Sequence, residues 1–130
     1  MKEVVHVPVI SDALTKRKVP ISPAVKANGF VFVSGAPPID PDTGELVNGT
    51  IEQQTDAVMR YIEKVLTASG SSFAKVVKVT IFAANSAYFA RINEVYRQYF
   101  PSEPPARTFV TVGSWPMEFD IEIECVALAD

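Results

Sequence analysis

The sequence predicts a single α+β domain in which two helices lie on one face of a mixed β-sheet. Two observations carry this prediction. Segments rich in β-branched and aromatic residues, which are typical of strands, alternate with two segments whose apolar residues recur at helical spacing. The 130 residues also match the ordinary length of one domain, with no internal repeat. We expect one domain over residues 1–130 and the order β-β-α-β-α-β-β.

The N-terminal region begins with a short strand, expected within residues 3–9, where apolar residues alternate weakly. The next stretch, Ser11 to Lys18, is polar and basic and has no helical stripe, so we expect a loop there. Pro20 and Pro23 then fix an extended backbone that leads into a strand at Ala24-Val25.

A hairpin is expected next, because Asn28-Gly29 is a turn pair that tolerates positive φ. Its second strand, Phe30 to Ser34, is almost entirely apolar, as expected of a strand that is covered on both faces. Gly35 ends this strand and lets another group approach the backbone closely. Residues 36–49 are rich in Pro, Gly, Asp and Asn, which predicts a surface loop.

Two helices are predicted from capping signals and apolar spacing. The first runs from about Ile51 to Ser69 and begins with a capping box at Thr50. The second is capped by Asn85 or Ser86 and ends at Pro101.

Three strands are expected in the C-terminal half. One covers Phe73 to Ala83, and its alternation predicts that Val77, Val79 and Ile81 share one face. Another follows Pro104-Pro105 and contains Arg107. The last runs from Asp120 to Ala127, and its alternation separates an apolar face, with Ile121, Ile123 and Cys125, from a face with Glu122 and Glu124. The Cys125 thiol is therefore expected to be buried and inert.

The strands Phe30–Ser34 and Phe73–Ala83 carry apolar residues on both faces, although two helices can cover only one face of the sheet. Another copy of the chain is the simplest cover for the second face, so the sequence predicts a homo-oligomer. The loop that leads into the strand of Arg107 would then lie close to a neighbouring subunit, where pockets commonly form.

Composition argues against several classes of function. Twelve basic and fifteen acidic residues leave no basic surplus to attract nucleic acid or anionic lipid, so we expect neither as a partner. The sequence shows no leader pattern. It also shows no apolar run of the ~18 residues that a membrane span requires, so we expect a cytoplasmic protein. One cysteine and one histidine argue against a disulfide framework and a dense metal site. The signature motifs of nucleotide-binding loops, hydrolase elbows and zinc proteases are also missing.

Arg107 is the leading candidate for a functional residue. It is a permanently charged planar fork in an otherwise apolar or hydroxylic segment, placed where a rigid loop enters a strand. Such a fork can hold a carboxylate or phosphate through two parallel hydrogen bonds. The alternative is a structural arginine that pairs with a nearby acid or extends to solvent.

The other polar candidates are weaker when each is taken alone. Glu122 and Glu124 are equally consistent with the wet face of a strand, and Asn93 with an exposed position on the second helix. Gly35 is equally consistent with a simple strand terminator.

Four segments together resemble the RidA (YjgF) family: Gly29 to Gly35, Asp40 to Glu45, Pro105 to Thr108, and Ile121 to Glu124. They occur in the family's order and spacing, from about Ser22 to the C-terminus. The resemblance implies a chorismate-mutase-like α+β fold, a homotrimer, and three sites at the subunit interfaces. It thus agrees with the oligomer expected from the apolar sheet face.

The resemblance also implies an activity, the hydrolysis of enamines and imines of small 2-imino acids to 2-keto acids and ammonia. In this family pattern Arg107 binds the substrate carboxylate, and Glu122 positions or activates the attacking water. Asn93, Ser34 and Gly35 contribute to the pocket. No metal or organic cofactor is implied, and the expected partners are a small carboxylate substrate and two further copies of the chain.

Two positions depart from the family pattern. Ile21 stands where active members often have tyrosine, and Phe109 stands where they often have cysteine. Both replacements remove a polar group from the expected substrate-binding pocket. Two hypotheses therefore remain open, an imine or enamine deaminase and a non-catalytic trimer that binds small keto or amino acids. Some family members are described as ribonucleases, a function that the acidic charge balance does not favour.

Overall fold

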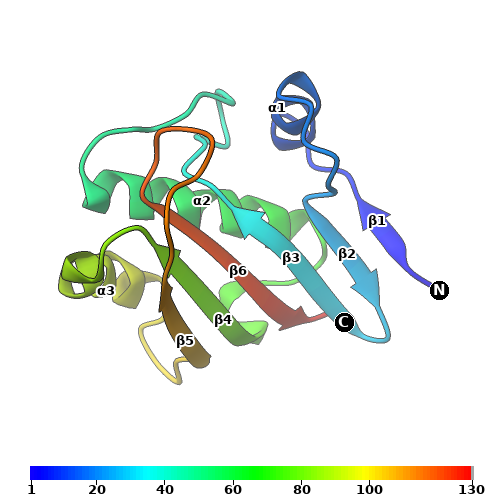
Figure 1. Ribbon diagram of the computed structural model, residues 1–130. Coiled ribbons are helices and arrows are strands. Elements are labelled where there is room, and N and C mark those ends of the chain that lie inside the picture. The colour runs from blue at the N-terminus through cyan, green and yellow to red at the C-terminus, as the bar shows by residue number, and fades with distance from the viewer. Residues whose placement is uncertain (130) are drawn as a thin grey trace.

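Six strands form one sheet in the computed structural model, which describes residues 1–129 (Figure 1). The order across the sheet is β1-β2-β3-β6-β4-β5. The strands are β1 (Glu3–Val5), β2 (Ala24–Ala27), β3 (Phe30–Ala36), β4 (Val76–Ala83), β5 (Ala106–Thr111) and β6 (Ile121–Leu128). Neighbouring strands are antiparallel except β4 and β5, which are parallel. The sheet is therefore mixed, as predicted.

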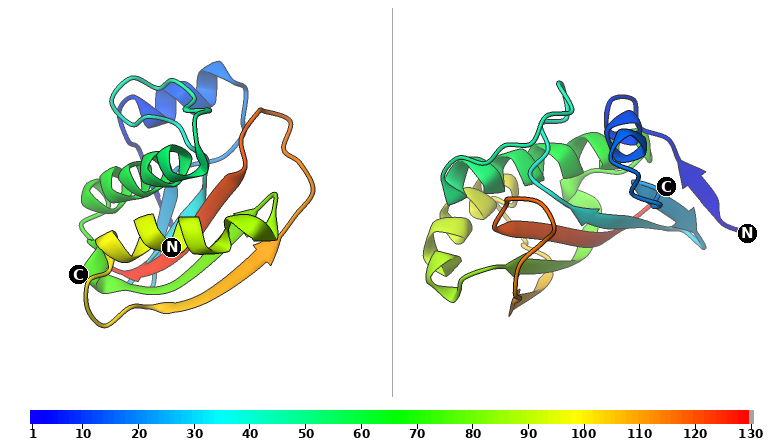
Figure 2. Two further views of the ribbon diagram at one scale, coloured as in Figure 1. Left: turned by 90° about the vertical axis from the view of Figure 1, so that its left-hand side faces the viewer. Right: turned by 45° about the horizontal axis from the view of Figure 1, so that its top comes forward.

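Three α-helices accompany the sheet: α1 (Ile10–Lys16), α2 (Ile51–Ala68) and α3 (Phe89–Tyr99). Short 3-10 turns precede β4 at Phe73–Lys75 and α3 at Ser86–Tyr88. The long helices α2 and α3 cover the same face of the sheet (Figure 2), which confirms the α+β class with two helices on one face. None of the helices within residues 1–129 is long and apolar enough to cross a membrane.

Local signals account for the ends of these elements. The predicted capping box is present, since the Thr50 side chain accepts from the Gln53 N–H and the Gln53 side chain accepts from the Thr50 N–H. Asn28 and Gly29 both have positive φ, 56° and 81°, as a tight hairpin between β2 and β3 requires.

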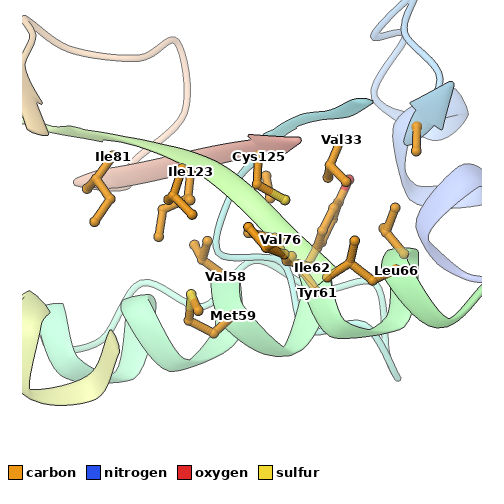
Figure 3. Close-up of a cluster of buried hydrophobic side chains, with 14 of the residues drawn as sticks. Val33, Val58, Met59, Tyr61, Ile62, Leu66, Val76, Ile81, Ile123 and Cys125 are labelled. Atoms are coloured by element: carbon orange, nitrogen blue, oxygen red, sulfur yellow. The ribbon is translucent and has the colours of Figure 1, made fainter. Parts of the chain in front are cut away.

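The core lies between α2 and the sheet (Figure 3). Val58 and Ile62 of α2 face Ile123 and Cys125 of β6, and all four side chains are buried. Burial raises the pKa of the Cys125 thiol to about 12. The thiol is thus un-ionised at neutral pH, as expected for an inert core cysteine.

The loop predicted for Ser11 to Lys18 is wrong, because most of this stretch belongs to α1. The helix buries Ile10, Ala13 and Leu14, which lie three and four positions apart on one face. Ile10 lies just before the stretch Ser11 to Lys18, so the apolar stripe of the helix cannot be recognised within that stretch alone. The chain therefore has one more helix than the expected order. The short strand expected within residues 3–9 is present as β1, which pairs with β2.

The predicted face of Val77 is also wrong. Val76 pairs with Ala127 and Lys78 pairs with Val126, so Val77 is an extra residue in β4 without a partner of its own. This bulge turns Val77 outward, where it is 41% exposed, while Val76 is buried in its place.

The face of the sheet opposite α2 and α3 is uncovered, and exposed apolar side chains share it with Glu122 and Glu124. It exposes large side chains of four strands, namely Phe30, Phe32, Val77, Val110 and Leu128. This is the uncovered face that the sequence predicts. The homotrimer that would cover it remains a prediction.

Candidate functional site

Arg107 points from β5 toward α3. It shares a sheet face with Val79 and Cys125, the residues aligned with it on β4 and β6, and both are buried under the helices. Its Nη1 donates a hydrogen bond of 2.7 Å to Oδ1 of Asn93. The guanidinium carbon lies 4.9 Å from the ring centroid of Tyr96 and 5.6 Å from that of Phe89.

Arg107 has no acidic partner among residues 1–129, in contrast to two other arginines. Arg91 makes a bidentate pair with Glu52, and Arg60 pairs with Asp42. Arg107 instead contacts one neutral amide and two aromatic rings. The alternative that a nearby acid neutralises it does not hold within one subunit, so its charge is available to a ligand.

A hollow of about 240 Å³ lies beside Arg107. Its walls are Asn93, Tyr96, Arg97, Pro104, Pro105 and Arg107. Phe109 is on the same sheet face as Arg107, but it is not one of these wall residues. Its ring packs edge to face on Phe89, with centroids 5.0 Å apart and an interplanar angle of 80°.

Glu122 lies on the opposite face of the sheet. It is aligned with Phe82 of β4, whose other neighbour in register is the exposed Val110 of β5. Its carboxylate occupies the space beside Gly35, where a Cβ atom would collide with Oε2 of Glu122. Gly35 has no positive φ. A glycine is therefore needed here for this close approach rather than for its backbone conformation.

The environment of Glu122 suits proton exchange. Burial, and secondly the charge of Glu124, raises the pKa of Glu122 above its usual value. Its carboxylate makes no hydrogen bond or ion pair with other described residues. An unpaired carboxyl with a raised pKa can serve as a general acid or base, because it takes up a proton more readily than an ordinary carboxyl does.

Ser34 directly precedes Gly35 and is hydrogen-bonded to Ser22, the residue after Ile21. The register between β3 and β6 shifts between Val33 and Ala36, which is where Ser34 and Gly35 lie. The Ser34 hydroxyl donates to the Ser22 carbonyl at 2.6 Å. This bond ties the start of the irregularity to the segment of Ile21, whose side chain is 45% exposed.

The candidate residues thus form two groups. The arginine half-site comprises Arg107, Asn93, Tyr96, Phe89 and Phe109, and the glutamate half-site comprises Glu122, Gly35, Ser34 and Ile21. The sheet separates Arg107 from Glu122, so one small molecule cannot contact both within a single subunit. Phe89 and Tyr96 were not among the site residues predicted from the sequence. Their spacing from Asn93, four and three residues, was the signal that they share its face.

The fold and these residues agree with the comparisons to known proteins. A family model described as Endoribonuclease L-PSP matches residues 13–129. Reactive Intermediate Deaminase A, chloroplastic, from Arabidopsis thaliana is 44% identical over 108 residues. The match covers 83% of this chain but only 58% of that relative.

Solved structures support the same family. A putative endoribonuclease from Thermotoga maritima is 45% identical, with a TM-score of 0.88 and coverage of 100% of this chain and 99% of that one. E. coli TdcF with bound serine is 32% identical, with a TM-score of 0.79 and coverage of 85% and 89%. The α+β fold and these matches define the class, and the chain belongs to the RidA (YjgF) family.

Proposed function

We propose that the protein is an enamine and imine deaminase that hydrolyses small 2-imino acids to 2-keto acids and ammonia. The single observation that carries this proposal is Arg107, a half-buried residue that lies beside a hollow and has no acidic partner among residues 1–129. A substrate carboxylate supplies the missing negative charge and can use the planar fork.

The reaction requires a held substrate, a placed water and one proton shuttle. Arg107 binds the carboxylate of the imino acid. Glu122 takes a proton from water as its oxygen bonds to the imine carbon. The same proton then passes to nitrogen, which gives a carbinolamine. As the carbon–nitrogen bond breaks, the second water proton moves from the carbinolamine hydroxyl through Glu122 to nitrogen, so ammonia leaves and the 2-keto acid remains. This chemistry calls for no metal or organic cofactor.

The active assembly in this proposal is a homotrimer. The exposed apolar face of the sheet favours association with further copies. Since Arg107 and Glu122 lie on opposite faces of one sheet, a complete site joins the arginine half-site of one subunit to the glutamate half-site of its neighbour.

Two relatives support the class of ligand. One carries the name Reactive Intermediate Deaminase A, although this chain spans only 58% of its length. The other is TdcF, whose structure holds serine, a small amino acid with a carboxylate. The family description names an endoribonuclease, but a net charge of −3 favours a small-molecule substrate over nucleic acid. A cytoplasmic location remains a prediction.

The second candidate function is non-catalytic binding of small keto or amino acids. Ile21 favours it, because an exposed apolar side chain stands at the position where active family members often have a tyrosine, and it cannot supply a hydrogen bond. A coupled assay that generates 2-aminoacrylate in situ, with and without the protein, separates the two functions. Faster release of keto acid in the presence of the protein supports the deaminase. If the protein accelerates this release with none of the amino acid precursors tested, non-catalytic binding is the remaining function.

Mixed trimers test the shared site directly. Arg107→Ala and Glu122→Gln subunits, each inactive alone, are denatured together at equal amounts and refolded. Random mixing restores a wild-type pair at about one quarter of the interfaces, so about one quarter of the parent activity is expected. Light scattering should give about three times 14.2 kDa. Activity that stays at the level of the separate variants would contradict a site shared between subunits.

A further inference from the structure

We infer that Tyr96 and Phe89 are positioning residues that hold the Arg107 guanidinium for the carboxylate, an inference that rests on the proposed function. Together with Asn93 they form a cradle on α3. The three residues lie four and three positions apart, so they project from one side of the helix. Helix α3 and strand β5 run side by side (Figure 2). The contacts of Asn93 and Tyr96 with Arg107 show that this side of α3 is turned toward the guanidinium.

Each cradle residue restrains the guanidinium in a different way. Asn93 accepts from Nη1 and therefore fixes the direction of one edge of the fork. Tyr96 and Phe89 place aromatic rings within 4.9 Å and 5.6 Å of the guanidinium carbon. Both distances lie within the range at which a cation is attracted to a ring. A long and flexible side chain is thus held in place before a ligand arrives, which reduces the ordering needed on binding.

The two rings are themselves fixed by other aromatic side chains. Tyr96 is 6% exposed and packs on Phe100, with ring centroids 4.9 Å apart. Phe89 is 45% exposed and is held by the edge-to-face contact with Phe109. Phe109 therefore supports the cradle through Phe89.

The hydroxyl of Tyr96 does not explain why a tyrosine stands beside Arg107. It is buried and has no hydrogen-bond partner among the described residues, an arrangement that costs free energy. Its pKa is raised by burial to about 12, so it stays protonated at neutral pH. The ring is consequently the part of Tyr96 that serves Arg107, and Tyr96→Phe keeps that part.

The test measures binding of 2-ketobutyrate by calorimetry, together with kcat and KM for 2-aminoacrylate. Tyr96→Leu removes the ring and should raise the Kd by about threefold to thirtyfold. KM should rise by a similar factor while kcat changes by less than about twofold, because the carboxylate is held equally before and during the reaction. Tyr96→Phe should restore the Kd to within about twofold of the parent.

Two further variants keep the result interpretable. Phe89→Leu alters an exposed side chain, so it should fold even if Tyr96→Leu does not, and its Kd should rise about threefold. Tyr99→Leu is the matched control on the same helix, since Tyr99 contacts Phe73 and Asp56 instead of Arg107. It should lower Tm and leave the Kd unchanged.

The outcomes separate this inference from the proposed function. The cradle alone would be overturned if Arg107→Ala loses binding while Phe89→Leu keeps the parent Kd. Tyr96→Leu, if it folds, would then keep the parent Kd as well. Unchanged binding in Arg107→Ala would overturn the carboxylate clamp itself, and the cradle with it. The cradle is supported if Kd rises in Tyr96→Leu and Phe89→Leu but not in Tyr96→Phe.

Discussion

The arginine half-site and the glutamate half-site hold their charged groups by opposite means. Arg107 is restrained by a hydrogen bond and two rings, all from α3 of the same subunit. Glu122 has no such partner among the described residues. Its carboxylate fits beside Gly35 only because a glycine has no Cβ atom there. A group that never changes its charge is thus held firmly, whereas the group that would exchange a proton is left without a partner.

This difference has an electrostatic consequence. Neutral contacts restrain Arg107 without cancelling its charge, so attraction for an anionic ligand is retained. For Glu122, burial without a compensating hydrogen bond disfavours the charged form and raises the pKa. Each half-site therefore has the property that its proposed role requires.

Replacing Arg107 should give the largest effect. Arg107→Ala removes the clamp, and loss of a hydrogen-bonded charge pair costs about 2–5 kcal/mol of binding free energy. Calorimetry with 2-ketobutyrate should find binding almost abolished in a trimer that remains folded. Arg107→Lys should recover little, because a point charge cannot reproduce the fork. An alanine variant that binds as tightly as the parent would make Arg107 a structural residue.

Gly35→Ala should affect the other half-site in a different way. The added methyl group displaces the end of the flexible Glu122 side chain, so the fold should survive. A misplaced catalytic group lowers the rate, and we expect kcat to fall about 10- to 100-fold. The Kd for 2-ketobutyrate should stay near the parent value, because Arg107 is unaffected.

Gly113→Ala is the control for this substitution. A Cβ at Gly113 meets nothing within 4 Å, and its φ is not positive. Its kcat should equal that of the parent. Equal losses of kcat in both alanine variants, or a loss of binding in Gly35→Ala, would contradict the separate roles of the half-sites.

The elements that were predicted well depend on local signals. The capping box at Thr50 and the alternation of Ile121, Ile123 and Cys125 each involve residues a few positions apart, and both are confirmed. Helix α1 was missed because its three buried residues span only five positions and begin outside the polar stretch. Val77 was misplaced because a bulge arises from the pairing of β4 with β6, which the sequence of one strand does not contain.

The division of the candidate site into two halves could not be predicted for a similar reason. Alternation assigns Phe109 to the face of Arg107, but it cannot relate Arg107 to Glu122 on a different strand. That relation depends on the strand order β6-β4-β5 and on the register across three strands. The sequence also predicted another copy of the chain close to Arg107, because the apolar second face needs a cover, and this stays a prediction.

The smallest expected effect is a dependence of stability on pH that also tests the contact between half-sites. Below the usual value near 4.5, Glu122 is protonated in the folded and unfolded states and contributes no penalty. As pH rises through the raised folded pKa, ionisation favours the unfolded chain, so stability falls. In an Arg107→Ala background, Glu122→Gln should therefore raise Tm at pH 8, on the order of 1 °C, and leave it unchanged at pH 4.

With Arg107 present, the same substitution should raise Tm at pH 8 by less, because the neighbouring subunit's guanidinium would stabilise the Glu122 carboxylate. Glu124→Gln is the control, since Glu124 is exposed and is only the second cause of the raised pKa. Its effect on Tm should be smaller than that of Glu122→Gln in the Arg107→Ala background. Equal gains from Glu122→Gln with and without Arg107 would place the two half-sites beyond electrostatic reach of each other. No gain in either background would contradict the raised pKa.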